Sequence, residues 1–198
     1  MYLIVLNIPV ILTFLNTLEG MKMKLFYLFV LLFGMMLSAQ EKATGPIISE
    51  FGAVYKISNP DFKTNVESEF KVVFDVYSSP KDPNMLNRSI ETAARFLNMH
   101  SQAGVPAEQL HVALVVHGKA ALDVLVSTAY KKRNAVDNPN EPLLHDLLSN
   151  KVSVILCGQS ANGRGIEKSE LIPGVQLALS AMTALIQLQN QGYQLIKF

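Results

Sequence analysis

The segment Val152–Gly158 reads VSVILCG, a short apolar and β-branched run that ends in the chain's one cysteine and a glycine. Such a run is typical of a β-strand that is covered on both faces. We therefore predict a strand at Val152–Cys157, followed by a loop or short helical turn at Gly158–Gly165. In open α/β sheets, ligands bind beyond the carboxyl ends of the strands, and this strand would place Cys157 at such an end.

Comparable runs on both sides of this segment predict the rest of the fold. The further strands are predicted at Lys71–Tyr77, His111–Val116 and Tyr193–Phe198. Apolar residues spaced by three and four predict the helices that alternate with these strands. The first helix is predicted to begin at Asp82, which caps it, with Pro83 at its first helical position. The other helices are predicted at Ala120–Lys132, Glu141–Leu148 and Pro173–Gln191. This alternation predicts an α/β fold with a mainly parallel sheet of four or five strands in a three-layer sandwich.

The first 40 residues have the composition of a leader. Met21–Gln40 contains Lys22 and Lys24, then about 13 apolar residues and a small-residue cleavage region, which is the pattern of a secretory signal peptide. Residues 1–20 form a second apolar stretch without basic residues, so Met1 can be a misassigned start. We expect an exported, periplasmic or secreted protein, and keep a two-helix membrane anchor formed by residues 1–40 as the alternative.

The remainder divides into an arm and a domain. Glu41–Glu67 is rich in glycine, proline and asparagine, which predicts an extended N-terminal arm with one edge strand near Ala53–Ile57. Residues 68–198 contain the regular pattern and are predicted to form the α/β domain. Without residues 1–40, acidic and basic side chains are equal in number. A neutral domain without a basic cluster argues against nucleic acid as a partner.

The candidate chemistry gathers at the predicted carboxyl ends of the strands. A thiol at Cys157, followed by Gly158 and a helix start, can have a lowered pKa, although free cysteine is more often a small buried hydrophobe. His117 can stabilise a thiolate or move a proton, and Gly118 would let a ligand approach the backbone. The alternative is that His117 only closes its strand by hydrogen bonding. Asp75, inside an apolar strand, needs polar partners.

Other residues give less support for chemistry. The glycines after the cysteine form neither a P-loop nor a dinucleotide-binding motif, no serine-hydrolase elbow is present near Ser160, and the four histidines have no metal-ligand spacing. We therefore predict no metal and no cofactor. Arg164 can bind an anion or be solvated. We expect surface positions for His100, His111 and His145, and core positions for Phe70, Phe74, Tyr77 and Phe96.

The cysteine loop, Cys157-Gly-Gln-Ser-Ala-Asn-Gly-Arg164-Gly165-Ile166, resembles that of the DsrE/DsrF/TusD-type sulfur-relay proteins. Leu114-Val-Val-His117-Gly118 and Pro173-Gly174-Val175 support the resemblance by their order. It implies a flavodoxin-like fold, a homo-oligomer of three or six subunits, and a cysteine that accepts sulfur as a persulfide from a donor protein or a small sulfur species. The residues that would bind around the cysteine are Gly118, Gly158, Ser160, Arg164 and Gly165.

Three functions remain open at this point. In the first, Cys157 carries sulfur with support from His117 and Arg164. In the second, the chain is a non-catalytic periplasmic binding or assembly module that keeps the fold and the oligomer. In the third, Cys157 senses redox state through an intermolecular disulfide. The characterised relay chemistry is cytoplasmic, so the predicted export signal is a departure from the family pattern.

Overall fold

The computed structural model describes residues 24 and 41–197, and the chain divides into the units Met1–Gln40 and Glu41–Phe198. The fold described below is that of the second unit. The predicted leader, its signal peptide and the alternative start codon lie outside the described residues. Within the described part of the chain, no helix has the length and apolar character that a membrane crossing requires.

A five-stranded parallel sheet forms the centre of the domain. Its strands are β1 (Phe70–Val76), β2 (Leu110–Val116), β3 (Ser153–Cys157), β4 (Gln176–Ala178) and β5 (Gln194–Ile196), in the spatial order β4-β3-β2-β1-β5. Val116 pairs with Val76 on one side and with Leu156 on the other, so the three central strands end at nearly the same level. The carboxyl ends of these strands therefore form one edge, as the sequence predicted.

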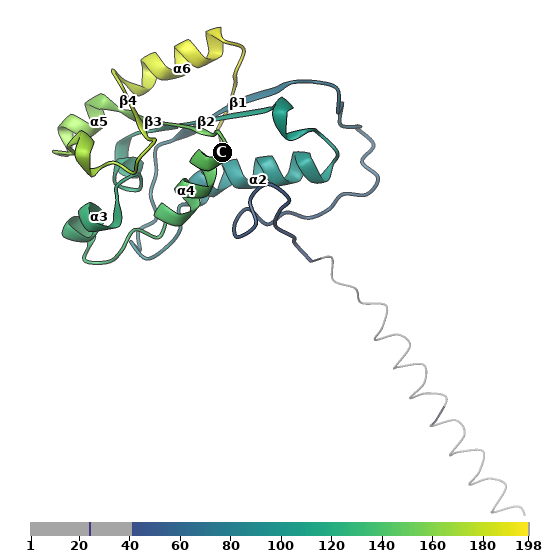
Figure 1. Cartoon of the computed structure of the whole chain (residues 1–198), viewed down its shortest axis with the longest axis horizontal. Helices are drawn as coiled ribbons and strands as arrows, with labels where there is room; N and C mark the ends of the chain where they lie inside the picture. The colour runs from purple at the N-terminus through teal and green to yellow at the C-terminus, as the bar shows by residue number, and fades with distance from the viewer. Residues whose placement is uncertain (1–23, 25–40, 198) are drawn as a thin grey trace, which may run out of the picture. The chain divides into compact units, whose positions relative to one another are not determined.

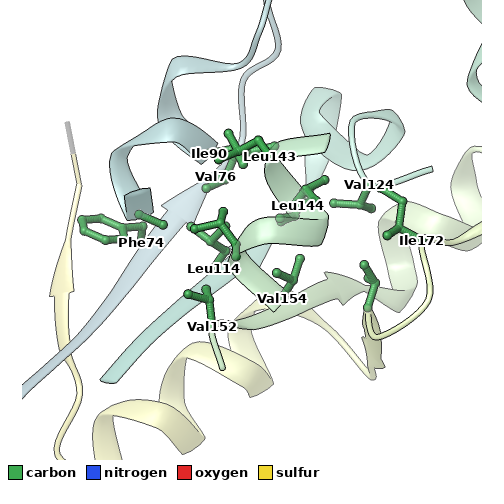
Figure 2. Packing of buried hydrophobic residues seen from close by; sticks show 14 of the residues in the cluster. Phe74, Val76, Ile90, Leu114, Val124, Leu143, Leu144, Val152, Val154 and Ile172 are labelled. Atoms are coloured by element: carbon green, nitrogen blue, oxygen red, sulfur yellow. The ribbon is translucent and has the colours of Figure 1, made fainter. Parts of the chain in front are cut away.

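Helices cover both faces of this sheet, which confirms the predicted α/β layers. The α-helices are α2 (Arg88–Gln102), α3 (Ser127–Asn134), α4 (Glu141–Ser149), α5 (Gly158–Gly163) and α6 (Ala181–Asn190), and the 3-10 turns are η1 (Ala107–Gln109), η2 (Gly118–Leu122) and η3 (Lys168–Glu170). Helix α6 lies on one face, and α2 and α4 lie on the other (Figure 1). The larger apolar cluster fills the α2 and α4 side (Figure 2).

The first helix begins later than predicted. It starts at Arg88, and the side chain of Asn87 caps it by accepting a hydrogen bond from the N–H of Ser89 (2.9 Å). Asp82 instead accepts a hydrogen bond from the N–H of Asn84, which closes a local turn. An aspartate followed by a proline suits a turn as well as a helix start, and the buried Asn87 has the better-placed cap.

The helix predicted at Ala120–Lys132 is broken in the structure. Turn η2 ends at Leu122, and α3 begins only at Ser127. The side chain of Asn138 donates hydrogen bonds to the carbonyl oxygens of Asp123 (2.8 Å) and Leu125 (2.6 Å). These two carbonyls are therefore held by a tertiary contact at the break between the two helices, a contact that local propensity does not register.

The long helix predicted at Pro173–Gln191 is wrong in its first half. Residues Gln176–Ala178 form β4 at the sheet edge, and α6 begins at Ala181, with the Ser180 side chain accepting a hydrogen bond from the N–H of Thr183 (3.0 Å). Met182, predicted to face inward, is 73% exposed. Because the start of the helix is displaced, the inward positions predicted for its first two turns do not hold.

The N-terminal arm is packed on α2 and carries no regular edge strand. A single antiparallel bridge between Ala43 and Val54 replaces the strand expected near Ala53–Ile57. The buried side chain of Asn98 accepts a hydrogen bond from the N–H of Ile48 and donates to the carbonyls of Ile48, Phe51 and Gly52. One helix side chain thus satisfies several arm backbone groups and fixes the arm in place.

Candidate functional site

Cys157 is the last residue of β3 and lies where two helices begin. It precedes α5 directly, and the N–H of Ala181, the first residue of α6, also points at its sulfur. The side chain is 5% exposed and packs in the smaller apolar cluster with Val73, Ala113 and residues of α6. The structure therefore places the thiol at the predicted edge of the sheet, on the α6 face.

The surroundings of Cys157 favour its ionised form. Burial alone would raise the pKa of the thiol, but hydrogen bonds from the N–H and hydroxyl of Ser160, and from the N–H groups of Ala181 and Gln159, lower it below the usual value. Donors at helix starts act on an anion through both their hydrogen atoms and the helix dipole. The arrangement can hold a thiolate in a largely buried position.

Ser160 links the cysteine to the end of β2. Its Oγ accepts a hydrogen bond from the N–H of Gly118 (3.0 Å), so the hydroxyl proton is free to point at the sulfur of Cys157. Gly118 has a φ of +58°, and a Cβ at this position would lie 2.3 Å from the ring of Tyr77. The left-handed φ therefore favours glycine at residue 118, and a larger residue would also displace the half-exposed Tyr77 ring.

Gly158 allows β4 to approach the cysteine. A Cβ built on Gly158 would lie 2.5 Å from the carbonyl oxygen of Ala178, which is paired in register with Cys157. The predicted residues Gly118, Gly158 and Ser160 are thus brought together with Cys157. For the two glycines, the role that the structure shows is to allow close packing around the sulfur and its donors.

His117 belongs to a separate polar group on the same face. Its Nε2 hydrogen bonds to Oδ1 of Asp75 (2.5 Å), and Nζ of Lys197 donates to Oδ2 of Asp75 (2.9 Å). Burial opposes ionisation of Asp75, but Lys197 and His117 together hold the pKa of this carboxyl below its usual value. Asp75 therefore has the polar partners that a carboxylate in an apolar strand requires. Among the described residues, His117 makes no hydrogen bond to Cys157.

Arg164 and Gly165 lie at the far end of α5. Arg164 is exposed, and its side chain makes no hydrogen bond or ion pair with any residue that the structure describes. Gly165 adopts a left-handed φ of +58°, and its carbonyl accepts a hydrogen bond from Arg133. Arg133 also binds Glu170, which lowers the pKa of that carboxyl to about 2. This part of the loop is anchored away from the sulfur, with Arg164 left toward solvent.

Two predicted positions need correction. Tyr77, expected in the core, is 50% exposed, because β1 ends at Val76 and the ring packs beside His117 (5.2 Å between ring centroids). His100, expected on the surface, is half-buried against the rings of Phe96 and Phe70. Across residues 41–197, no three His, Cys, Asp or Glu side chains are grouped in a way that could hold a metal ion.

Sequence reasoning missed several groups of the site. The N–H donors of Gln159 and Ala181 are backbone groups, and no side-chain pattern announces them. Lys197 was not connected to Asp75, since the pair is separated by 122 positions. Ser180 at the start of α6 is the one usable indication, because serine is a preferred cap, and it would have placed the helix start beside the cysteine.

The domain is similar to known proteins. A family model described as the DsrE/DsrF-like family matches residues 71–198. Among solved structures, the chain resembles the protein of unknown function MTH1491 from Methanobacterium thermoautotrophicum, with 16% identity and a TM-score of 0.50 over 66% of this chain and 100% of that chain. It also resembles the ychN protein from E. coli, with 22% identity and a TM-score of 0.48 over 65% of this chain and 99% of that chain. No curated protein matches it.

Proposed function

The chain belongs to the DsrE/DsrF-like family, and from that premise we propose that Cys157 accepts and carries a sulfane sulfur as a persulfide. The observation that carries this proposal is the set of donors around the thiol. Three N–H groups and the Ser160 hydroxyl lower the pKa of Cys157 despite its burial. A thiolate is the form of cysteine that reacts with sulfane sulfur, so a lowered pKa supports this chemistry.

The proposed transfer is a thiol exchange that needs no oxidant. The thiolate of Cys157 attacks the outer sulfur of a donor persulfide, R–S–SH. A bond forms between Sγ and that sulfur, the S–S bond of the donor breaks, and the donor leaves as the thiolate R–S⁻ with the electron pair. The proton stays on the transferred sulfur, giving Cys157–S–SH. Attack by an acceptor thiolate on the same outer sulfur returns Cys157 to its starting state.

The surrounding side chains have different parts in this proposal. Ser160 is a positioning residue whose hydroxyl is oriented by the N–H of Gly118. Arg164 is exposed and free to attract an anionic sulfur donor toward the edge of the sheet. His117 supports the site less directly, through the group that it forms with Asp75 and Lys197. The donor is a persulfide-bearing protein or a small sulfur species.

The proposal also covers the cellular location of the protein and its oligomeric state. The composition of Met21–Gln40 supports export to the periplasm or the exterior. Family membership supports a homo-oligomer. Leu177, Leu179, Met182 and Ile186 are exposed apolar residues on β4, α6 and the turn between them, and a subunit contact is one use of such a surface.

A second candidate is a non-catalytic binding or assembly module, and the burial of Cys157 favours it. At 5% exposure the thiol has the environment of a structural cysteine, which packs as a small hydrophobe. The same burial argues against a redox sensor that works by an intermolecular disulfide, since the two sulfurs would have to meet.

The two candidates differ in what happens to the mass of the protein. The purified protein is exposed to a sulfane-sulfur donor such as glutathione persulfide, and its intact mass is recorded before and after reduction. The carrier proposal predicts the gain of one sulfur atom, reversed by reduction and absent in Cys157→Ser. Because the chain has one cysteine, no second thiol can account for the gain. An unchanged mass, with Cys157 also inert to iodoacetamide in the folded state, would leave the binding module in place.

A further inference from the structure

A cavity of about 710 Å³ lies on the face of the sheet opposite Cys157, between α2 and the β1–β5 edge. Its apolar wall includes Phe70 and Phe74 of β1, Phe96 of α2 and Ile196 of β5, and Val54 of the arm closes part of it. Phe74 lies at the margin of the labelled core in Figure 2. The volume is within the range of small-molecule binding sites, which are mostly apolar with a few polar groups.

Two arginines give the cavity a positive rim. Arg88 and Arg95 line it, both are exposed, and neither side chain has a hydrogen bond or ion pair to another residue of the described chain. Asp75 is the one acidic residue among the described lining residues, and its carboxylate is already bound by His117 and Lys197. Among the described residues, the two lining arginines therefore have no carboxylate that pairs with them.

His100 adds polarity to the cavity without adding charge. Its Nδ1 is 2.8 Å from the carbonyl oxygen of Phe96, which can only accept, so this nitrogen carries the proton. Burial lowers the pKa of His100, which leaves the ring neutral at pH 7. Among the described lining residues, the positive charge therefore comes from Arg88 and Arg95, and both of these residues are exposed.

We infer that this cavity binds a small amphipathic anion, with a single carboxylate held by Arg88 and Arg95 and an apolar tail against Phe70, Phe74 and Ile196. A guanidinium pairs well with a carboxylate because its planar N–H donors match both oxygens. The ligand class is that of a medium-chain fatty acid. This inference is independent of the sulfur chemistry proposed for Cys157, because the two sites lie on opposite faces of the sheet.

The shape of the recess favours a small ligand over a second copy of the chain. Three separate parts of the fold, the sheet edge, α2 and the arm, form its walls, so the apolar surface is concave. A second copy of the chain would also have to supply acidic groups opposite the two arginines, whereas a small carboxylate ligand supplies its own negative charge. The arm wall, Val54, lies outside residues 71–198, the part that matches the family model.

Isothermal titration calorimetry with dodecanoate tests the inference, with dodecanol as the probe that lacks the charge. We expect one dodecanoate per chain, bound about tenfold or more tightly than dodecanol, since a charge-assisted hydrogen bond contributes at least that factor. The double variant Arg88→Gln, Arg95→Gln should lose about tenfold or more of dodecanoate affinity while binding dodecanol unchanged. Lys132→Gln removes an exposed charge on α3 and is the matched control.

A second variant tests the location independently of charge. Thr92→Trp should fill the cavity and abolish binding of both probes, while the circular dichroism spectrum and thermal midpoint show that the protein is still folded. The inference is overturned if dodecanoate shows no saturable binding, if dodecanol binds equally well, or if the arginine variants leave the affinity unchanged. Phosphatidylglycerol vesicles that bind the protein through the same arginines when dodecanoate does not would point to a membrane surface and would also refute it.

Discussion

Asp123 makes the stability of the domain depend on pH in a direction that can be calculated. The carboxyl is 1% exposed, and it accepts hydrogen bonds from the hydroxyl of Ser79 (2.9 Å) and the side-chain amide of Asn87 (2.7 Å). Burial raises its pKa from 3.8 to about 6, and the two hydrogen bonds only partly oppose this. The folded protein therefore binds a proton at Asp123 that the unfolded chain releases between these two pH values.

The sign follows from the raised pKa. The contribution of Asp123 to folding is fully present below pH 3.8 and is lost as pH rises through about 6. The difference between the two pKa values corresponds to about 3 kcal/mol in total, of which about 1 kcal/mol is lost between pH 5 and pH 7. His100 acts in the opposite direction in this range, because burial lowers its pKa and its contribution is lost as pH falls.

Asp123→Asn separates these two effects. Asparagine is neutral at every pH, its oxygen can accept from Asn87, and its amide can donate to Ser79, so the local bonding survives. Urea unfolding of both proteins at several pH values from 5 to 7 should show the variant gaining about 1 kcal/mol relative to the wild type across the range. The exposed Asp61→Asn is the control and should show no such trend. A stability difference between Asp123→Asn and the wild type that stays constant from pH 5 to 7 would refute the reasoning.

Three further outcomes follow from the contacts described above. Ser160→Ala should raise the pKa of the Cys157 thiol, measured as a shift to higher pH of the iodoacetamide reaction rate, whereas Ser160→Thr keeps a hydroxyl and should shift less. Gly118→Ala should destabilise the domain by about 1 kcal/mol or more in urea because of its left-handed φ, while Gly163→Ala, where a Cβ meets nothing within 4 Å, should not. Asn98→Ala should cost about 3 kcal/mol and make residues 41–57 the first target of limited proteolysis.

The central strands and the family could be predicted because their evidence is local. The runs ending at Val116 and Cys157 are apolar enough to identify buried strands, and the loop after Cys157 identified the family that the match over residues 71–198 confirms. The elements that were misread depend on tertiary contacts. Asn138 holds the carbonyls at the break before α3, and β4 is a three-residue strand that exists only by pairing with β3.

The site could be predicted at the level of its strand ends, and not at the level of its hydrogen bonds. Cys157, Ser160 and Gly118 were placed together because parallel strands end at the same edge of a sheet. The role expected for His117 rested on that proximity, but an imidazole pairs with the nearest strong acceptor, and Asp75 provides it. The groups that bond to the sulfur are mostly backbone N–H donors, whose direction is set by where α5 and α6 begin.

Burial and ionisation of Cys157 have separate effects on its reactivity, and one experiment can measure both. The pH at which the iodoacetamide rate reaches half its plateau reports the pKa, and the plateau itself reports access to the sulfur. We expect a half-plateau pH below the usual cysteine value, because the fixed N–H donors favour the thiolate. We also expect a plateau well below that of the urea-unfolded chain, because Cys157 is 5% exposed.

A low plateau with an ordinary half-plateau pH would mean that burial outweighs the donors, and the carrier proposal would lose its physical basis. A low half-plateau pH with a plateau near that of the unfolded chain would mean that β4 and the start of α6, which cover the sulfur, open readily, as short and weakly packed elements do. Sulfur donors could then reach the thiolate.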